Sequence, residues 1–208
     1  DWYKETPKHP KDSNMNQLPL RKSFKACSPF LDSFSTGYVL TTSCDLAVDN
    51  LTEKDTVITW NKDIGYLPID LRSHEAALPN RKLPIPKGFS SQHFVWQTRI
   101  SYTIPKGYSA LLTHPLNRYD LPFLTLSGII DGHMTLHFGN LPVFFSKNFN
   151  GIIPQGTPYA QLILFKTEDW TSEEDAAVLE QERINQNHTR SHAVGWYKNT
   201  FWRKKTYN

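Results

Sequence analysis

Cysteines and long apolar runs are both scarce in this sequence, and each scarcity excludes a class of protein. The 208 residues include two cysteines, Cys27 and Cys44, too few for a disulfide framework or a four-thiolate metal site. The longest apolar runs, 143–145 and 162–165, fall far short of the roughly 20 residues that a membrane-spanning helix needs. The first twelve residues contain no apolar core, so we expect neither a secretory signal nor a membrane partner.

Charge and motifs are equally sparse. The chain has 23 basic and 20 acidic residues, a net charge of +3 that is well short of a dedicated nucleic-acid binder. It contains no GxSxG, GxGxxG, HExxH or P-loop pattern. Its 10 glycines are outnumbered by 14 prolines, and 13% of its residues are aromatic. This composition favours short strands over long helices.

The clearest strand signal is an alternation over residues 93–104, whose even positions read Phe, Trp, Thr, Ile, Tyr and Ile. Such a pattern predicts one half-buried strand, because successive side chains point to opposite faces. Residues 78–88 contain three prolines and are predicted to form a loop. Further short strands are predicted at 38–43, 56–60, 108–113, 121–126, 133–138, 142–145 and 159–166. Many short strands with turns between them predict an all-β sandwich or barrel.

One helix is predicted near the C-terminus, at 171–187. Thr171 and Glu174 have the spacing of a capping box, and the acids that follow suit the positive end of a helix dipole. Residues 1–25 show no helical or strand period and are predicted to be an extended arm. The predicted organisation is therefore an arm at 1–25, a β domain at 26–170, a surface helix at 171–187 and a tail at 188–208.

The tail alternates aromatic and basic residues, which suits either of two partners. Such a segment can dock into a groove of another protein, with its cations at the rim. Rings and cations together can also bind single-stranded nucleic acid. We favour protein docking, because the rest of the chain shows no matching basic stripe. The docking residues would be Trp196, Tyr197, Phe201, Trp202, Arg203, Lys204, Lys205 and Tyr207.

No metal site is predicted. His133 and His137 alternate with apolar residues as on a strand, where four residues span about 13 Å. Both imidazoles would have to lie about 2 Å from one zinc ion, so the pair cannot share a metal without a bulge. Asp45, Asp131 and Asp169 could act as general bases or magnesium ligands, but the sequence alone does not bring them together.

Three segments, in order, resemble motifs of the dUTPase and dCTP-deaminase superfamily. They read IPKGYSALL from residue 104, GIID from 128 and GTPYAQLI from 156, with a weaker match, SCDLA, from 43. The resemblance covers about residues 37–167 and implies a β-clip, dUTPase-like barrel of short strands. It marks five turn or support positions: Gly107, Gly128, Asp131, Gly156 and Gln161. The glycines permit the positive φ of a tight turn, and the buried amide of Gln161 can satisfy backbone groups beneath a hairpin.

The departures from the family pattern concern its phosphate-binding residues. The family's P-R-S-G corresponds to residues 113–117, which contain neither Arg nor Ser. No Tyr follows Asp131, the family's G-D-R has become GTP at 156–158, and its glycine-rich closing tail is missing. A triphosphate bound without these cations would keep poorly compensated negative charges. The sequence therefore favours a protein without the family's activity.

The chain also resembles proteins of tailed phages, and β-clip domains recur in phage particles as trimeric decoration proteins. We therefore expect a virion protein, a capsid or tail component that needs no cofactor. It would act as a non-enzymatic structural or interaction module, a homo-oligomer with three subunits as the expected number, and would bind other virion proteins through its arms. The alternatives are a nucleic-acid-binding module that uses the tail, or a divergent nucleotide hydrolase or deaminase in the host cytoplasm. That enzyme would use Mg²⁺ with Asp131, Asp45, His133 and His114.

Overall fold

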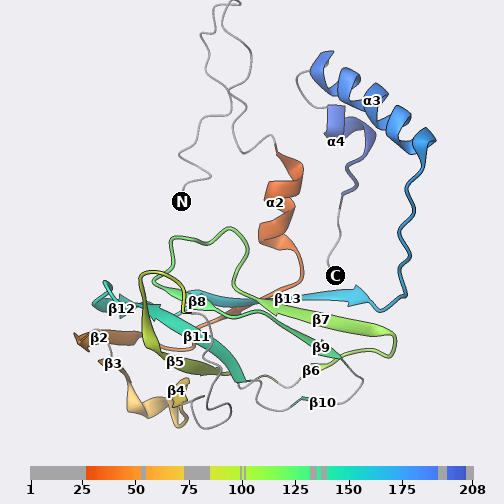
Figure 1. The fold of residues 1–208 in the computed structure, drawn as a ribbon. Coiled ribbons are helices and arrows are strands. Elements are labelled where there is room, and N and C mark those ends of the chain that lie inside the picture. The colour runs from red at the N-terminus through yellow and green to blue at the C-terminus, as the bar shows by residue number, and fades with distance from the viewer. Residues whose placement is uncertain are drawn as a thin grey trace, which may run out of the picture. The chain divides into compact units, whose positions relative to one another are not determined.

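A computed structural model describes residues 27–52, 55–72, 85–98, 100, 102–131, 135–136, 140–191 and 196–204. The chain divides into two compact units. The β unit is Gly37–Glu168, and the terminal unit combines residues before Gly37 with residues after Glu168. Figure 1 shows the ribbon of the whole chain.

The β unit consists of short strands. Its described elements are β1 (Tyr38–Thr41), β2 (Leu46–Thr52), β3 (Asp55–Trp60), a 3₁₀ turn η2 (Lys62–Ile64), β4 (Ile69–Arg72), β5 (Phe89–Gln97), β6 (Tyr102–Thr103), β7 (Tyr108–Thr113), β8 (Phe123–Thr125), β9 (Gly128–Asp131), β10 (Thr135–Leu136), β11 (Asn140–Ser146), β12 (Gly151–Ile153) and β13 (Pro158–Lys166). All of their pairings are antiparallel. The prediction of an all-β domain of short strands is confirmed.

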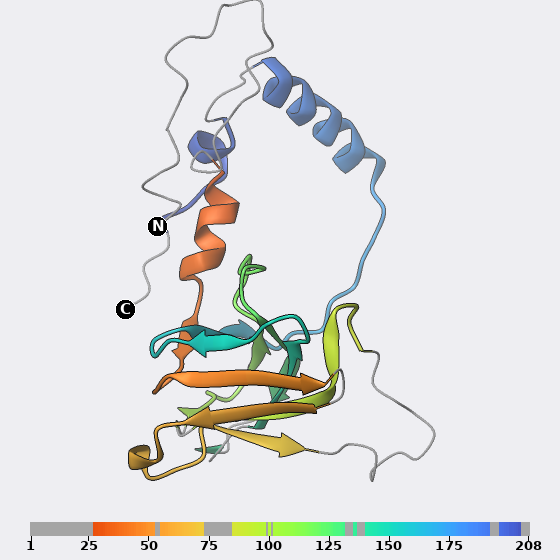
Figure 2. The ribbon, with the colours of Figure 1, turned by 90° about the vertical axis from the view of Figure 1, so that its left-hand side faces the viewer.

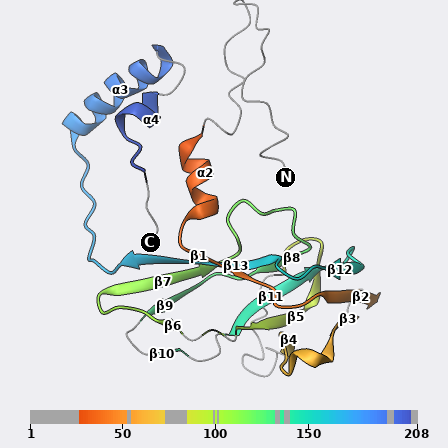
Figure 3. The same ribbon diagram turned by 180° about the vertical axis from the view of Figure 1, so that it is seen from behind.

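The strands form three sheets and one small pair. The sheet orders are β1-β13-β7-β9, β12-β2-β3 and β4-β5-β11-β8, with β10 paired to β6. Figure 2 shows β2 and β3 side by side, and Figure 3 shows β1 along β13. The loops between these strands bring segments from both ends of the β unit next to one another.

Aromatic rings fill the centre of the β unit. Trp96 lies between Phe123 and Tyr159, with ring centroids 5.2 and 4.8 Å away. Its indole Nε1 donates a hydrogen bond to Thr125 Oγ1 at 3.0 Å, so the buried polar group is satisfied. Buried side chains of all three large sheets join these rings in one hydrophobic core.

The single strand predicted at 93–104 is wrong in its length. β5 ends at Gln97, and residues 102–103 form the separate strand β6. The predicted half-burial is wrong as well, since His93 and Val95 are as buried as Phe94 and Trp96. β5 is flanked by β4 and β11, and an interior strand can be covered on both faces.

The terminal unit contains three described helices, α2 (Ser28–Ser35), α3 (Ala176–Ser191) and α4 (Trp196–Thr200). The predicted capping box is wrong: the helix begins five residues later, where Asp175 Oδ1 accepts the N–H of Ala177 at 2.8 Å. A local Asp cap replaces Thr171, because Asp is a strong N-cap residue. Among the described residues, no helix has the length and apolar character that crossing a membrane requires.

The start of the predicted β domain and the predicted tail both contain helices. α2 was not predicted, although Pro29 at its first turn is a common helix start. The tail at 188–208 is not wholly extended, because α3 runs to Ser191 and α4 follows at Trp196–Thr200. The arm predicted at 1–25 lies outside the described residues.

Candidate binding groove

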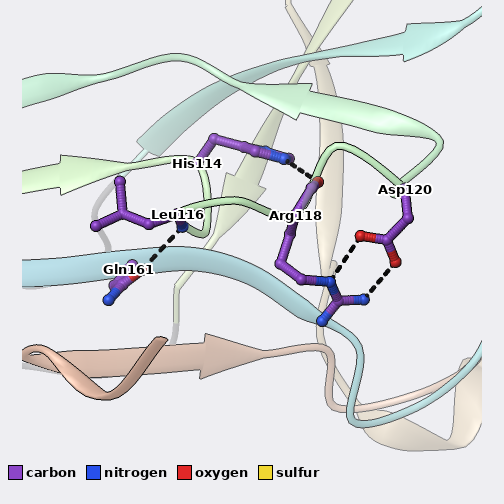
Figure 4. Close-up of polar contacts among 5 residues, drawn as sticks. All are labelled: His114, Leu116, Arg118, Asp120 and Gln161. Atoms are coloured by element: carbon purple, nitrogen blue, oxygen red, sulfur yellow. Dashed lines mark hydrogen bonds and ion pairs between the residues drawn. The ribbon is translucent and has the colours of Figure 1, made fainter. Parts of the chain in front are cut away.

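The loop between β7 and β8, residues 114–122, is held by the buried side-chain amide of one residue of β13. Gln161 on β13 is only 1% exposed, and its Oε1 accepts the backbone N–H of Leu116 at 2.9 Å (Figure 4). This is the supporting role that the sequence predicts for Gln161. A buried hydrogen bond of this kind fixes the loop because both groups lose it if the loop moves.

His114 provides a second support for the same loop. Its Nδ1 accepts the backbone N–H of Thr125 at 3.3 Å, so the ring proton is on Nε2, which donates to the carbonyl of Arg118 at 2.9 Å. Burial lowers the pKa of His114. The lowered pKa favours the neutral imidazole, and both of its nitrogens are engaged in bonds that hold the loop.

The backbone turns sharply just before Arg118. Asn117 has a φ of 61°, a left-handed conformation that Asn tolerates better than most residues. The N–H of Arg118 donates to the carbonyl of Pro115 at 3.2 Å, which closes the turn. These contacts set the position from which the Arg118 side chain extends.

Arg118 forms a two-pronged ion pair with Asp120. Its Nε donates to Oδ1 at 2.7 Å and its Nη2 to Oδ2 at 2.8 Å, which lowers the pKa of the Asp120 carboxyl (Figure 4). The pair is partly exposed, so it adds little stability. Nη1 takes no part in these two bonds, and it leaves part of the guanidinium able to donate to another group.

Arg118 lines a groove of about 430 Å³. One wall contains Arg118, Leu121 and Pro122, and the other contains Phe149 and residues 152–158. Ile152 is 63% exposed whereas Ile153 is buried, because neighbouring residues of a strand point to opposite faces. Since both line the groove, it follows the edge of β12, the outer strand of its sheet. The groove is therefore a mostly apolar surface beside β12 with one guanidinium.

The two candidate carboxylates lie at opposite ends of one sheet. Asp131 ends β9 opposite Ser109, which pairs with Phe165 on β13. Asp45 follows β1, which meets the other end of β13 at Pro158. Pro158, opposite β1, and Phe165, in the row of Asp131, are seven residue steps apart along β13, which is about 23 Å at 3.3 Å per residue. The structure does not bring Asp45 and Asp131 to one site.

Each of these carboxylates also has a bond within the fold. Asp131 Oδ1 accepts the hydroxyl of Ser109 at 2.6 Å, and Asp45 Oδ1 accepts the N–H of Gln155 at 2.7 Å. His133 lies outside the described residues. Within the described part of the chain, no group of three or more His, Cys, Asp and Glu side chains could hold a metal ion.

The predicted turn glycines have different outcomes. Gly107 and Gly156 have φ values of 81° and 82°, so both turns need the positive φ that the sequence predicts. Gly128 is different, because it begins β9 opposite Leu112 and has no positive φ. The segment GIID is thus a strand, with Asp131 as its last residue.

The predicted docking residues are divided by the structure. Trp202 Nε1 donates to Asp32 Oδ2 of α2 at 2.9 Å, so this ring anchors the tail inside the terminal unit. Tyr197 and Phe201 are about half exposed, with ring centroids 6.2 Å apart. Arg203 and Lys204 are exposed. Trp196 begins α4, its side chain is not among those described, and Lys205 and Tyr207 lie outside the described residues.

Sequence reasoning missed Arg118 and Asp120. The stretch that aligns with the family's phosphate loop stops at Asn117, one residue short of the arginine. The available signal was the Arg-x-Asp spacing inside a stretch of turn residues, where a short loop can fold the two side chains together.

No family model matches this chain, and no curated protein matches it. Among solved structures, it is similar to a dUTPase from phage phi11 of S. aureus. The identity is 17%, the match covers 52% of this chain and 96% of that chain, and the TM-score is 0.22. At this score the match assigns no role to any residue. The all-β class stands on the strand pairings described above.

Proposed function

We propose that this protein is a non-enzymatic structural or interaction module that assembles with copies of itself and with other proteins of a virus particle. The observation that carries the proposal is that Asp131 lies in one row of the sheet, whereas Asp45 follows the end of β1, whose row on β13 is about 23 Å away. Acid and base groups that act on one substrate must both lie within hydrogen-bond reach of it, directly or through one water. These two carboxylates are too far apart to do so.

The existing bonds of the candidate groups support the same proposal. Asp131 is held by Ser109, Asp45 holds the N–H of Gln155, and both ring nitrogens of His114 are engaged. His114 would have to give up a bond of the fold in order to act on a substrate, and the two carboxylates each already use one oxygen in the fold. These side chains therefore suit a scaffold better than a reaction centre.

Exposed apolar side chains support partner binding. Val39, Ile129 and Phe165 share one face of the sheet β1-β13-β7-β9. Phe165 is at an odd position of β13, Val39 pairs with Gln161, and Ile129 is in the row of Ile163 through Leu111. They are 43, 64 and 40% exposed. An antiparallel sheet that faces water on one side normally carries polar residues there. Apolar groups gathered on such a face are typical of a surface that binds another protein.

Arg118 favours a second candidate, a nucleotide-binding protein. Its Nη1 lies outside the bonds to Asp120, and Gly156 and Thr157 line the same groove. A guanidinium in a groove can bind a phosphate oxygen. Asp120 neutralises this cation, however, and a triphosphate needs several positive partners, so the groove favours a less charged ligand.

Thermal unfolding with a pool of deoxynucleotides and Mg²⁺ separates the two candidates. A ligand that binds the folded state raises the melting temperature. We expect no shift and no turnover of any nucleotide. A rise of several degrees, with turnover that is lost in Asp131→Asn and kept in the exposed control Asp49→Asn, would overturn the non-enzymatic proposal.

A further inference from the structure

We propose that the groove beside β12 receives residues 18–25 of a second copy of this chain, the segment LPLRKSFK. The inference rests on the proposed self-assembly and names the segment and the site through which copies join. Its support comes from the shape of the groove, from its chemistry and from its charge.

The shape of the groove fits an extended chain. Seven consecutive residues, 152–158, form most of one wall, and the groove follows the edge of β12 instead of opening into a deep cavity. Extended peptides commonly bind along the edge of a sheet, where the edge positions them and alternate side chains enter the groove. A groove lined by consecutive residues of one edge segment suits a peptide better than a compact ligand.

The apolar residues of the segment match the walls. The residue before a proline favours an extended conformation, so Pro19 favours that conformation at Leu18. Leu18 and Leu20 are two residues apart and would point to the same side of an extended chain. The groove offers that side Leu121, Phe149 and several prolines.

The charges are complementary as well. The segment contains three basic residues and no acidic one. Two carboxylates are bonded to residues that line the groove: Asp120 to the guanidinium of Arg118, and Asp45 to the main-chain N–H of Gln155. Arg118, Asp120 and Asp45 together carry a net charge of −1 next to the groove, which favours a basic segment. Arg118 Nη1 can in addition donate a hydrogen bond to a main-chain carbonyl of the bound segment. This bond does not require a negatively charged residue in the segment.

The chain length permits exchange between copies. Leu20 lies seven residues before Cys27, where the described part of the chain begins. Seven residues span at most about 25 Å when fully extended. The segment can therefore reach a groove on a neighbouring copy whose edge lies within that distance of Cys27.

Disulfide trapping in the full chain tests the inference. Two variants are prepared in a Cys27→Ser background, one with Leu20→Cys and the other with Ile152→Cys, and are mixed and oxidised. Cys44 is buried and is kept. We expect a covalent dimer whose digest contains a disulfide-linked peptide joining positions 20 and 152. The matched control replaces Ile152→Cys with Leu51→Cys, which is equally exposed at 66% but lies on β2, outside the groove.

The outcomes are distinct. Equal trapping at positions 51 and 152, or no 20–152 peptide, would overturn the inference. A further variant carries both Leu20→Cys and Ile152→Cys in one chain. If the 20–152 link forms only within single chains of this variant, the segment docks in its own chain, and the assignment to a second copy is overturned. If the protein is an oligomer and the link is absent, only this inference fails. If light scattering finds a monomer, the proposed assembly fails as well.

Discussion

Replacing Gln161 with leucine should loosen the loop that carries Arg118. Gln161→Leu keeps a similar volume but removes the acceptor of the Leu116 N–H, a bond of 2.9 Å at a residue that is 1% exposed. An unsatisfied buried donor costs about 1–3 kcal/mol, and the apolar side chain recovers part of that loss. We expect a net loss of about 1–2 kcal/mol in the free energy of unfolding.

Two measurements check this expectation. In a domain of this size, the loss corresponds to a fall in melting temperature of roughly 3–8 °C, and urea unfolding should show a lower midpoint with an unchanged slope. Hydrogen exchange should accelerate at Leu116, whose amide loses its partner. The control Gln155→Leu changes an exposed side chain of the same unit and should stay within about 0.5 kcal/mol of the parent protein. Unchanged stability together with unchanged exchange at Leu116 would refute the supporting role of Gln161.

Three further predictions concern other contacts. Gly37→Ala should strongly lower the melting temperature, because the added Cβ would overlap the carbonyl oxygen of Leu162 on β13. The control is Gly65→Ala: Gly65 has the same φ of +70° but open space around it, so we expect a loss of only about 1 kcal/mol in the free energy of unfolding. The pKa of His114 is lowered in the folded state, so its contribution to stability is complete above about pH 6.5 and is lost as the pH falls below that value. Urea titrations from pH 8 to 5 should therefore show a smaller loss in His114→Gln. Trp202→Phe and Asp32→Asn should each weaken the terminal unit by about 0.5–1.5 kcal/mol, non-additively, and expose the bond after Arg203 to trypsin.

Strong local patterns predicted β7 and β13, the two inner strands of their sheet, well. β7 has the predicted bounds, and β13 begins one residue before its predicted start, because both are continuous apolar segments between clear turn signals. The strands β2, β4, β9 and β12 were missed. Of these, β9 and β12 begin with glycine, a residue typical of turns, and have three or four residues, so the pairing with a neighbouring strand decides the structure.

The candidate site was only partly predictable, for a similar reason. Gln161 was singled out because a polar residue inside an apolar strand needs a partner. The partner itself, the N–H of Leu116, comes from a loop 45 positions away. The bond between Trp202 and Asp32 joins residues 170 positions apart, and no local signal marks it. Contacts of this kind depend on the fold and cannot be read from neighbouring residues.

The mass of the full chain in solution tests the central claim most directly. Light scattering over a range of concentrations should give a stable oligomer, with three times the chain mass as the expected value, and the mass should not change when deoxynucleotides and Mg²⁺ are added. Self-assembly through surfaces of the fold requires no ligand. A monomer at every concentration, or an oligomer that forms only when nucleotide is present, would contradict the account.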